Sequence, residues 1–216
     1  MPYFVPPRLA GDAPVVGVGD DLSVAALRDA YYRGIFPWPI PGYPQLWFCP
    51  PQRAVLDFDR LHVPARLARL RRRTALTFTL DRAFDGVIAA CRQSPRPNQE
   101  GTWITPPMLR AYRALHRAGD AHSVEAWDEA GALVGGLYGV AAGGVFSGES
   151  MFHHAPNASK LALLFFLDHL RARGLGWIDI QVMTPHMAAL GAHEITRDAF
   201  LDRLEAEHAR GSTIFP

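Results

Sequence analysis

Residues 122–182 constrain the fold of this chain more than any other part of its sequence. Three apolar segments of strand length follow one another there, separated by short Gly-containing turns. They are His122–Trp127, Leu133–Ala141 and Gly144–Met151. Such short connections predict an antiparallel meander. A helix from Asn157 to Arg173 and a strand over Trp177–Val182 follow, and the helix is apolar on most faces, which predicts that it is buried.

The elements around this region complete a regular α/β pattern. Periodicity and helix-breaking residues predict the strand Ala75–Leu80 and the helices Arg82–Gln93, Pro106–Ala118 and Arg197–Ala209. The first 60 residues differ, because ten of the 18 prolines lie between Pro2 and Pro51 among many aromatic residues. There we predict a helix at Asp21–Tyr32 within irregular backbone. We expect an α+β protein with a small N-terminal α+β domain (residues 1–60) and a larger domain (residues 61–216).

Composition excludes several classes of protein. With 49% apolar and 20% charged residues and a net charge of +1, the chain is expected to fold into a sizeable core. It has no apolar run of the roughly 20 residues that a membrane helix needs, and no signal peptide opens it. Cys49 and Cys91 are too few for a disulfide framework, and His153-His154 lacks further ligands at metal-binding spacing. We therefore expect a soluble, cytoplasmic protein without a membrane partner or metal.

Two charged residues stand out in the apolar region. Glu149 follows a buried-looking strand, where a carboxylate is costly unless it has a partner or a function. Lys160 is the only lysine beside 21 arginines, and it lies where a helix begins. A single lysine can also be the residue that escaped a compositional bias.

A basic strip is predicted before the α/β region. Six arginines occur between Arg60 and Arg73, with no acidic residue over 60–80, on a helix that Pro64 can open. Five of them are our candidates for binding the phosphates of a nucleic acid: Arg66, Arg69, Arg71, Arg72 and Arg73. A solvated helix face is the alternative.

The order of elements resembles the Gcn5-related N-acetyltransferase fold, in which two strands separate in mid-sheet around the acyl donor. The resemblance implies a central mixed sheet in the larger domain. That family holds a pyrophosphate with a glycine-containing turn before the central helix, whereas His153–Lys160 contains no glycine. The donor is therefore not expected to be coenzyme A.

Four groups of motifs together resemble the leucyl/phenylalanyl-tRNA–protein transferase family. They are Gly19–Ser23 with Tyr32–Trp38; Gly101–Thr105 with Gly119–Glu125; Val134–Val140 with Phe146–Phe152 and Asn157–Lys160; and Ile178–Gln181 with His186 and Leu190–Glu194. The resemblance implies transfer of Leu or Phe, and Met less well, from aminoacyl-tRNA to the α-amine of proteins that begin with Arg or Lys, which marks them for N-end-rule degradation. It also implies a monomer without a cofactor. A non-catalytic tRNA-binding module and a coenzyme-A-dependent N-acetyltransferase remain as alternatives.

The resemblance also implies site residues. Its proposed catalytic pair corresponds to Asp179 and Gln181, which lie two apart on one strand and so share a face. We expect Gln181 to orient the attacking amine, with Asp179 polarising its amide. Glu149 is the candidate for binding the cationic acceptor.

Shape is expected to select the donor, because Leu and Phe are unbranched at Cβ whereas Val and Ile are not. The resemblance implies an apolar pocket of Leu137, Phe146, Met151, Leu163, Phe166 and Ile178, although each is also a plausible core residue. Trp47, Phe48 and Trp103 are candidates for stacking on the terminal adenosine, or for anchoring a domain interface. The chain departs from the family pattern at Phe48, where many relatives have Trp, and at Thr184-Pro185, where they have Asn-Asp.

Overall fold

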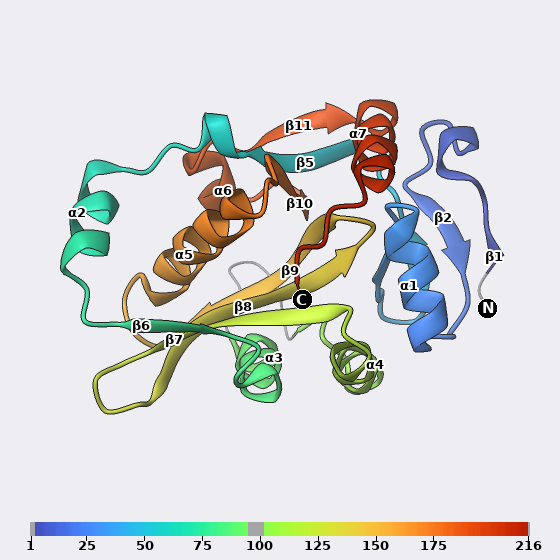
Figure 1. Cartoon of the computed structure of the whole chain (residues 1–216). Helices are drawn as coiled ribbons and strands as arrows, with labels where there is room; N and C mark the ends of the chain where they lie inside the picture. The colour runs from blue at the N-terminus through green and yellow to red at the C-terminus, as the bar shows by residue number, and fades with distance from the viewer. Residues whose placement is uncertain (1–2, 95–101, 216) are drawn as a thin grey trace.

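The computed structural model describes residues 3–94 and 102–215 (Figure 1). Gly101 of the predicted Gly101–Thr105 motif therefore lies outside the described residues. The strands are β1 (Tyr3–Phe4), β2 (Val15–Val18), β3 (Phe36–Trp38), β4 (Leu46–Phe48), β5 (Gln52–Asp57), β6 (Thr77–Leu80), β7 (Ala121–Trp127), β8 (Leu133–Ala142), β9 (Val145–His153), β10 (Trp177–Gln181) and β11 (His193–Thr196). The helices are α1 (Val24–Tyr32), α2 (Ala65–Arg73), α3 (Phe84–Gln93), α4 (Pro106–Arg117), α5 (Ala158–Ala172), α6 (Pro185–Ala189) and α7 (Arg197–Arg210).

A seven-stranded mixed sheet forms the centre of the molecule. Its strand order is β11-β5-β10-β9-β8-β7-β6, and the meander β7-β8-β9 is antiparallel as predicted. β10 runs parallel to β9, as expected for two strands joined by a helix. Among the described residues, these two strands share a single register pair, Asp179 opposite Ser147. They therefore meet at one point and are free to diverge beyond it.

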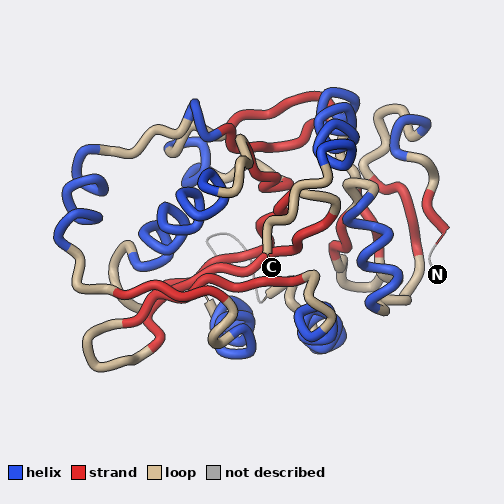
Figure 2. The backbone as a smooth tube through the Cα atoms, in the orientation of Figure 1, coloured by secondary structure: helices blue, strands red, loops and turns tan. Residues whose placement is uncertain are grey.

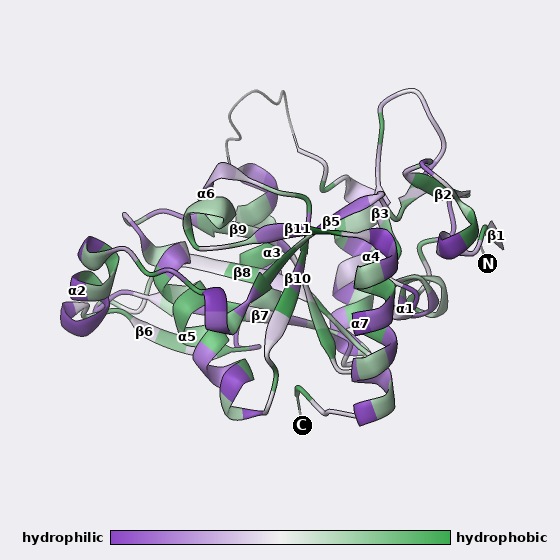
Figure 3. Ribbon diagram, turned by 90° about the horizontal axis from the view of Figure 1, so that it is seen from above, coloured by the Kyte–Doolittle hydropathy of each residue, from purple (hydrophilic) through white to green (hydrophobic). Residues whose placement is uncertain are grey.

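Helices cover both faces of this sheet (Figures 1 and 2). α3 and α4 lie on one face, and α5 lies on the other. Nine of the 15 residues of α5 are buried, which confirms the burial predicted from its apolar faces. Apolar residues concentrate on α5 and the central strands, whereas α2 and α7 show more polar surface (Figure 3).

The N-terminal region is more regular than predicted. The helix at Asp21–Tyr32 is present as α1, capped by the Ser23 hydroxyl. The prediction of irregular backbone around it was wrong, because β1, β2, β4 and β3 form a four-stranded antiparallel sheet. These strands have only two to four residues, so they carry little of the alternation that predicts a strand.

The position of β5 is relevant to the predicted boundary between the two domains. This strand precedes residue 60, yet it pairs with β10 and β11 in the large sheet. The division into two domains stays a prediction, and this pairing favours a boundary between Phe48 and Gln52 over one near residue 60.

Candidate active site

Glu149 lies at a β-bulge in the middle of β9. Across the ladder to β8, Tyr138 pairs with Ser150 and Gly139 pairs with Gly148, so Glu149 has no opposite residue. A bulge of this kind redirects a side chain. The Glu149 carboxylate accepts hydrogen bonds from the Tyr31 hydroxyl (2.7 Å), the Tyr112 hydroxyl (3.1 Å) and the Gln181 side-chain amide (2.5 Å).

This environment makes Glu149 unusually basic. Burial raises the pKa of its carboxyl from 4.5 to about 7, although the hydrogen bonds from Tyr31, Gln181 and Tyr112 favour the charged form. Burial also raises the pKa of both tyrosines, which keeps their hydroxyls protonated as donors. The site therefore contains a carboxyl group that can gain or lose a proton near neutral pH.

Asp179 is held in a buried ion pair. Its carboxylate receives two parallel hydrogen bonds from the Arg53 guanidinium, Nε at 2.8 Å and Nη2 at 2.7 Å, and a third from the Ser147 hydroxyl at 2.8 Å. Asp179 and Arg53 are 0% and 1% exposed. Burial disfavours the Arg53 charge, but the attraction of Asp179 outweighs it and raises the pKa of Arg53. The pair links β10 to β5 and is closed to solvent.

Gln181 ends β10 in an unusual conformation. Its φ is +63°, and the pairing with β5 shifts between Asp179 and Gln181, which marks a bulge at Ile180. The Asp179 carboxylate accepts a hydrogen bond from the Gln181 backbone N–H at 2.9 Å. The Gln181 side-chain amide donates to Glu149 and not to Asp179, and the predicted polarisation of that amide by Asp179 stays a prediction.

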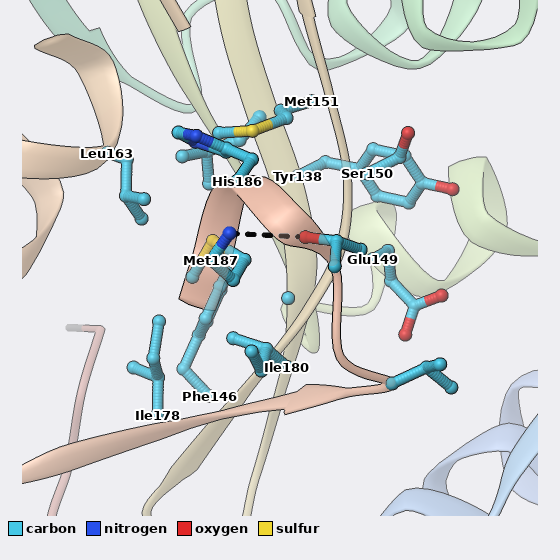
Figure 4. Close-up of a pocket in the computed structure, with 14 residues that line it drawn as sticks. Tyr138, Phe146, Glu149, Ser150, Met151, Leu163, Ile178, Ile180, His186 and Met187 are labelled. Atoms are coloured by element: carbon cyan, nitrogen blue, oxygen red, sulfur yellow. Dashed lines mark hydrogen bonds between the residues drawn. The ribbon is translucent and has the colours of Figure 1, made fainter. Parts of the chain in front are cut away.

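An apolar pocket of about 230 Å³ opens between β8, β9, β10, α5 and α6. Figure 4 shows Leu163, Ile178, Phe146 and Met187 gathered on one side of it, with Glu149 and Ser150 on the other. Its volume lies below the range of about 300–1,000 Å³ that is typical of sites for drug-sized ligands. It suits a single amino-acid side chain.

Five of the six residues predicted to form a pocket line this one: Leu137, Phe146, Met151, Leu163 and Ile178. Phe166 is fully buried and packs edge-on against Phe146 behind the lining. Ile178 contacts the pocket from the face of β10 opposite Asp179. Gln181 and Asp179 do not line it, and Gln181 reaches it through Glu149.

The three predicted stacking aromatics lie elsewhere. Trp47 is 0% exposed, packs against Phe4 and donates its indole N–H to the Gly19 carbonyl at 2.9 Å. An indole enclosed in this way cannot stack on a base, so that role for Trp47 is not compatible with the structure. Trp103 is nearly buried and stacks on Trp38, whereas Phe48 is half-buried.

The basic strip forms α2, whose arginines are exposed while Leu67 is buried. Arg71 differs from its neighbours because it pairs with Asp168 on α5. That contact attaches α2 to α5. The other four predicted phosphate-binding residues form no ion pair with any described residue; they are Arg66, Arg69, Arg72 and Arg73.

Several site residues were missed by sequence reasoning. Tyr31, Tyr112, Arg53, Ser147 and Met187 reach the site from five different elements. One signal was available: a buried aspartate such as Asp179 requires a cationic partner.

The chain departs from the family pattern at Thr184-Pro185, where α6 begins. The Thr184 hydroxyl caps this helix by accepting a hydrogen bond from the Met187 N–H at 3.2 Å, and Pro185 occupies the first helical turn.

Within the described residues, no three His, Cys, Asp or Glu side chains are grouped so as to hold a metal ion. The same residues include no helix long and apolar enough to cross a membrane.

Comparison with known proteins gives consistent matches along the chain. The family model described as leucyl/phenylalanyl-tRNA protein transferase matches residues 55–205, and the one for its N-terminal domain matches residues 20–51. A relative of that name from Maridesulfovibrio salexigens is 47% identical over 204 residues, covering 94% of this chain and 85% of its own length. Another from Chromohalobacter salexigens is 52% identical over 191 residues, covering 88% and 74%.

Among solved structures, L-PGS from Bacillus licheniformis matches with a TM-score of 0.40 and 17% identity, covering 72% of this chain and 51% of that one. This similarity is too weak to bear on the fold.

Proposed function

The chain belongs to the leucyl/phenylalanyl-tRNA–protein transferase family, and from that premise we propose that the pocket between β9 and β10 holds the side chain of the aminoacyl donor. The protein is an aminoacyltransferase that uses aminoacyl-tRNA as donor and a protein as acceptor. We further propose that the acceptors begin with Arg or Lys, that their modification marks them for N-end-rule degradation, and that a monomer carries out the reaction in the cytoplasm.

The pocket favours Leu and Phe because its lining is apolar and its volume is small. We propose that the pocket is narrow at its entrance, so that a side chain unbranched at Cβ can enter, whereas Val or Ile would place a methyl group there. Each misplaced methyl reduces binding by roughly 1–3 kcal/mol. The lining side chains Leu163, Ile178 and Met187 can exclude water from the bound donor.

The observation that carries the proposal is the position of Glu149. Glu149 lines the apolar pocket, and its carboxylate bonds Gln181, Tyr31 and Tyr112 beside it. An acceptor's cationic N-terminus bound there would lie beside an ester whose side chain fills the pocket. Such alignment of two reactants is worth up to about 7–11 kcal/mol.

The chemistry required of the protein is modest. The acceptor amine attacks the ester carbonyl, a C–N bond forms and the bond to the ribose oxygen breaks. The proton lost by the nitrogen is delivered to that oxygen, which leaves as the ribose hydroxyl. An α-amine has a pKa of about 7.7–8.0, so a useful fraction is neutral at pH 7. Gln181 is too weak a base to remove a proton and acts by orienting the amine, whereas Glu149, with a pKa of about 7, can accept the proton.

Asp179 acts as a positioning residue in this scheme. Its carboxylate is enclosed by Arg53 and Ser147 and also holds the backbone N–H of Gln181. That contact supports the left-handed backbone at Gln181, which directs the side-chain amide toward Glu149.

We also propose that the large sheet has the architecture of the Gcn5-related acetyltransferases. The single register pair between β9 and β10, and the pocket that opens where they diverge, support this assignment. The glycine-free segment His153–Lys160, which leads into the first turn of α5, speaks against coenzyme A as donor.

Mass spectrometry on two peptides tests the function. One peptide begins with Arg and the other carries the same Arg acetylated at its α-amine, and each is incubated with the protein and with tRNA charged with Leu or Phe. We expect the mass of one residue to be added to the free-amine peptide alone. No addition to either peptide, with the charged tRNA intact, would favour a non-catalytic tRNA-binding module.

A further inference from the structure

A second cavity, of about 340 Å³, adjoins the donor pocket. Three helices enclose this cavity: α2, the first turn of α5, and α6. Pro64 before α2, the cap residue Asn157 of α5 and Leu190 after α6 also line it. The lining residues are Pro64, Arg66, Leu67, Leu70, Asn157, Lys160, His186, Ala189 and Leu190. His186 lines both cavities, so a single side chain forms a shared wall between them.

The charges in this cavity all have one sign. Lys160 and Arg66 line it, and no carboxylate is among the lining residues. Neither cation makes a hydrogen bond or an ion pair to any part of the chain that the structure describes. Arg71 on the same helix contrasts with them, because Asp168 neutralises it. The buried Nε2 of His186 also has no hydrogen-bond partner among the described residues. Two unpaired cations in one cavity are suited to an anion.

The backbone adds to this preference. Asn157 caps α5 with a φ of +65° and makes no side-chain capping bond. The cavity therefore lies at the amino end of a 15-residue helix, where the helix dipole favours negative charge.

The location identifies which anion fits. The cavity lies between the arginines of α2, where tRNA phosphates are proposed to bind, and the pocket proposed for the aminoacyl side chain. In an aminoacyl-tRNA the amino acid is esterified to the terminal ribose, and the first phosphate is attached to the 5′ position of that same nucleoside. This phosphate is the donor anion nearest to the ester.

Resting on the proposed function, we propose that the cavity binds the 5′-phosphate of the terminal nucleoside of the donor tRNA through Lys160 and Arg66. A compact ammonium on a flexible stem fits a half-buried position better than a broad guanidinium. This explains why the only lysine of the chain is found here.

Two small donors isolate this contact from the rest of the tRNA. One is adenosine 5′-monophosphate that carries Phe on its 3′-hydroxyl, and the other is the same ester of adenosine without the phosphate. Transfer to an Arg peptide is measured with each donor for the wild type and for Lys160→Gln, Lys160→Arg and Arg66→Gln. Arg117→Gln, at an exposed position at the end of α4, is the matched control.

We expect Lys160→Gln to raise the KM for the phosphorylated donor about tenfold, because a hydrogen bond between charged groups is lost. The KM for the phosphate-free donor is expected to change less than twofold. Lys160→Arg is expected to restore part of the preference, and Arg66→Gln to raise the same KM by a smaller factor. Equal effects of Lys160→Gln on both donors, or a wild type that does not prefer the phosphorylated one, would overturn the proposal. Transfer from the phosphate-free donor tests the proposed function separately, because it requires only the aminoacyl pocket.

Discussion

Replacing Glu149 with Gln is expected to change how the stability of the protein depends on pH. The folded protein raises the pKa of this carboxyl from 4.5 to about 7, so the folded state binds its proton more tightly than the unfolded state does. The stabilisation from this proton is fully present below pH 4.5 and is lost as the pH rises toward 7. Glutamine has a similar shape and no titrating group, so the stability of the variant does not fall in this way as the pH rises.

The magnitude follows from the rise in pKa. It corresponds to about 3 kcal/mol in full, of which about 2.5 kcal/mol falls between pH 5 and pH 8. Urea denaturation of the wild type and of Glu149→Gln at pH 5, 6, 7 and 8 gives the difference in unfolding free energy at each pH. We expect the wild type to lose about 2.5 kcal/mol relative to the variant over this range.

Glutamine alters the hydrogen bonds with Tyr31 and Tyr112 at every pH, which shifts the difference in unfolding free energy by a constant amount. The change of this difference with pH is therefore the quantity that reports the titration of Glu149. Glu129→Gln, in the exposed turn after β7, controls for removing a surface charge. A difference that stays constant from pH 5 to pH 8, or that changes in the wild type's favour, would refute the argument that burial controls this carboxyl.

Further predictions concern the other parts of the site. Gln181→Ala is expected to reduce the rate of transfer at least a hundredfold while filter binding shows unchanged affinity for charged tRNA, since the side chain orients the amine. Asp179→Ala leaves a buried arginine unpaired and is expected to lower the unfolding free energy by about 3–5 kcal/mol in urea denaturation, whereas a loss below 1 kcal/mol would contradict the buried ion pair. Arg69→Glu combined with Arg72→Glu is expected to raise the KM for charged tRNA at low salt but not at about 0.5 M salt, and an unchanged value at low salt would assign the strip to a solvated face. Met151→Trp narrows the pocket and is expected to reduce kcat/KM for Phe about tenfold more than for Leu.

Local sequence signals predicted the parts of the fold that are built from neighbours in the chain. The meander β7-β8-β9 and the buried helix α5 were predicted because short turns and apolar periodicity determine them within a few residues. Glu149 could be singled out because a carboxylate among apolar residues requires an explanation.

The remaining parts depend on contacts that no local pattern encodes. β5 was not predicted as part of the large sheet, because its partners β10 and β11 come more than 100 residues later. Tyr31 and Tyr112 were missed as site residues because only the packing of α1 against α4 brings their hydroxyls to Glu149. The bulges at Glu149 and Ile180 were also hidden, since strict alternation assumes a regular ladder.

The ion pair between Arg53 and Asp179 has a consequence for synthesis of the chain. Its two partners are 126 residues apart, so Arg53 leaves the ribosome long before the strand that neutralises it. Sheets that depend on such distant pairings fold slowly. β10 also carries Gln181, so the strand that completes the ion pair is the strand that completes the site. A chain in which this strand has not yet formed lacks both the ion pair and the complete site. Aminoacyl transfer therefore begins only after β10 has paired with β5 and Asp179 has bound Arg53.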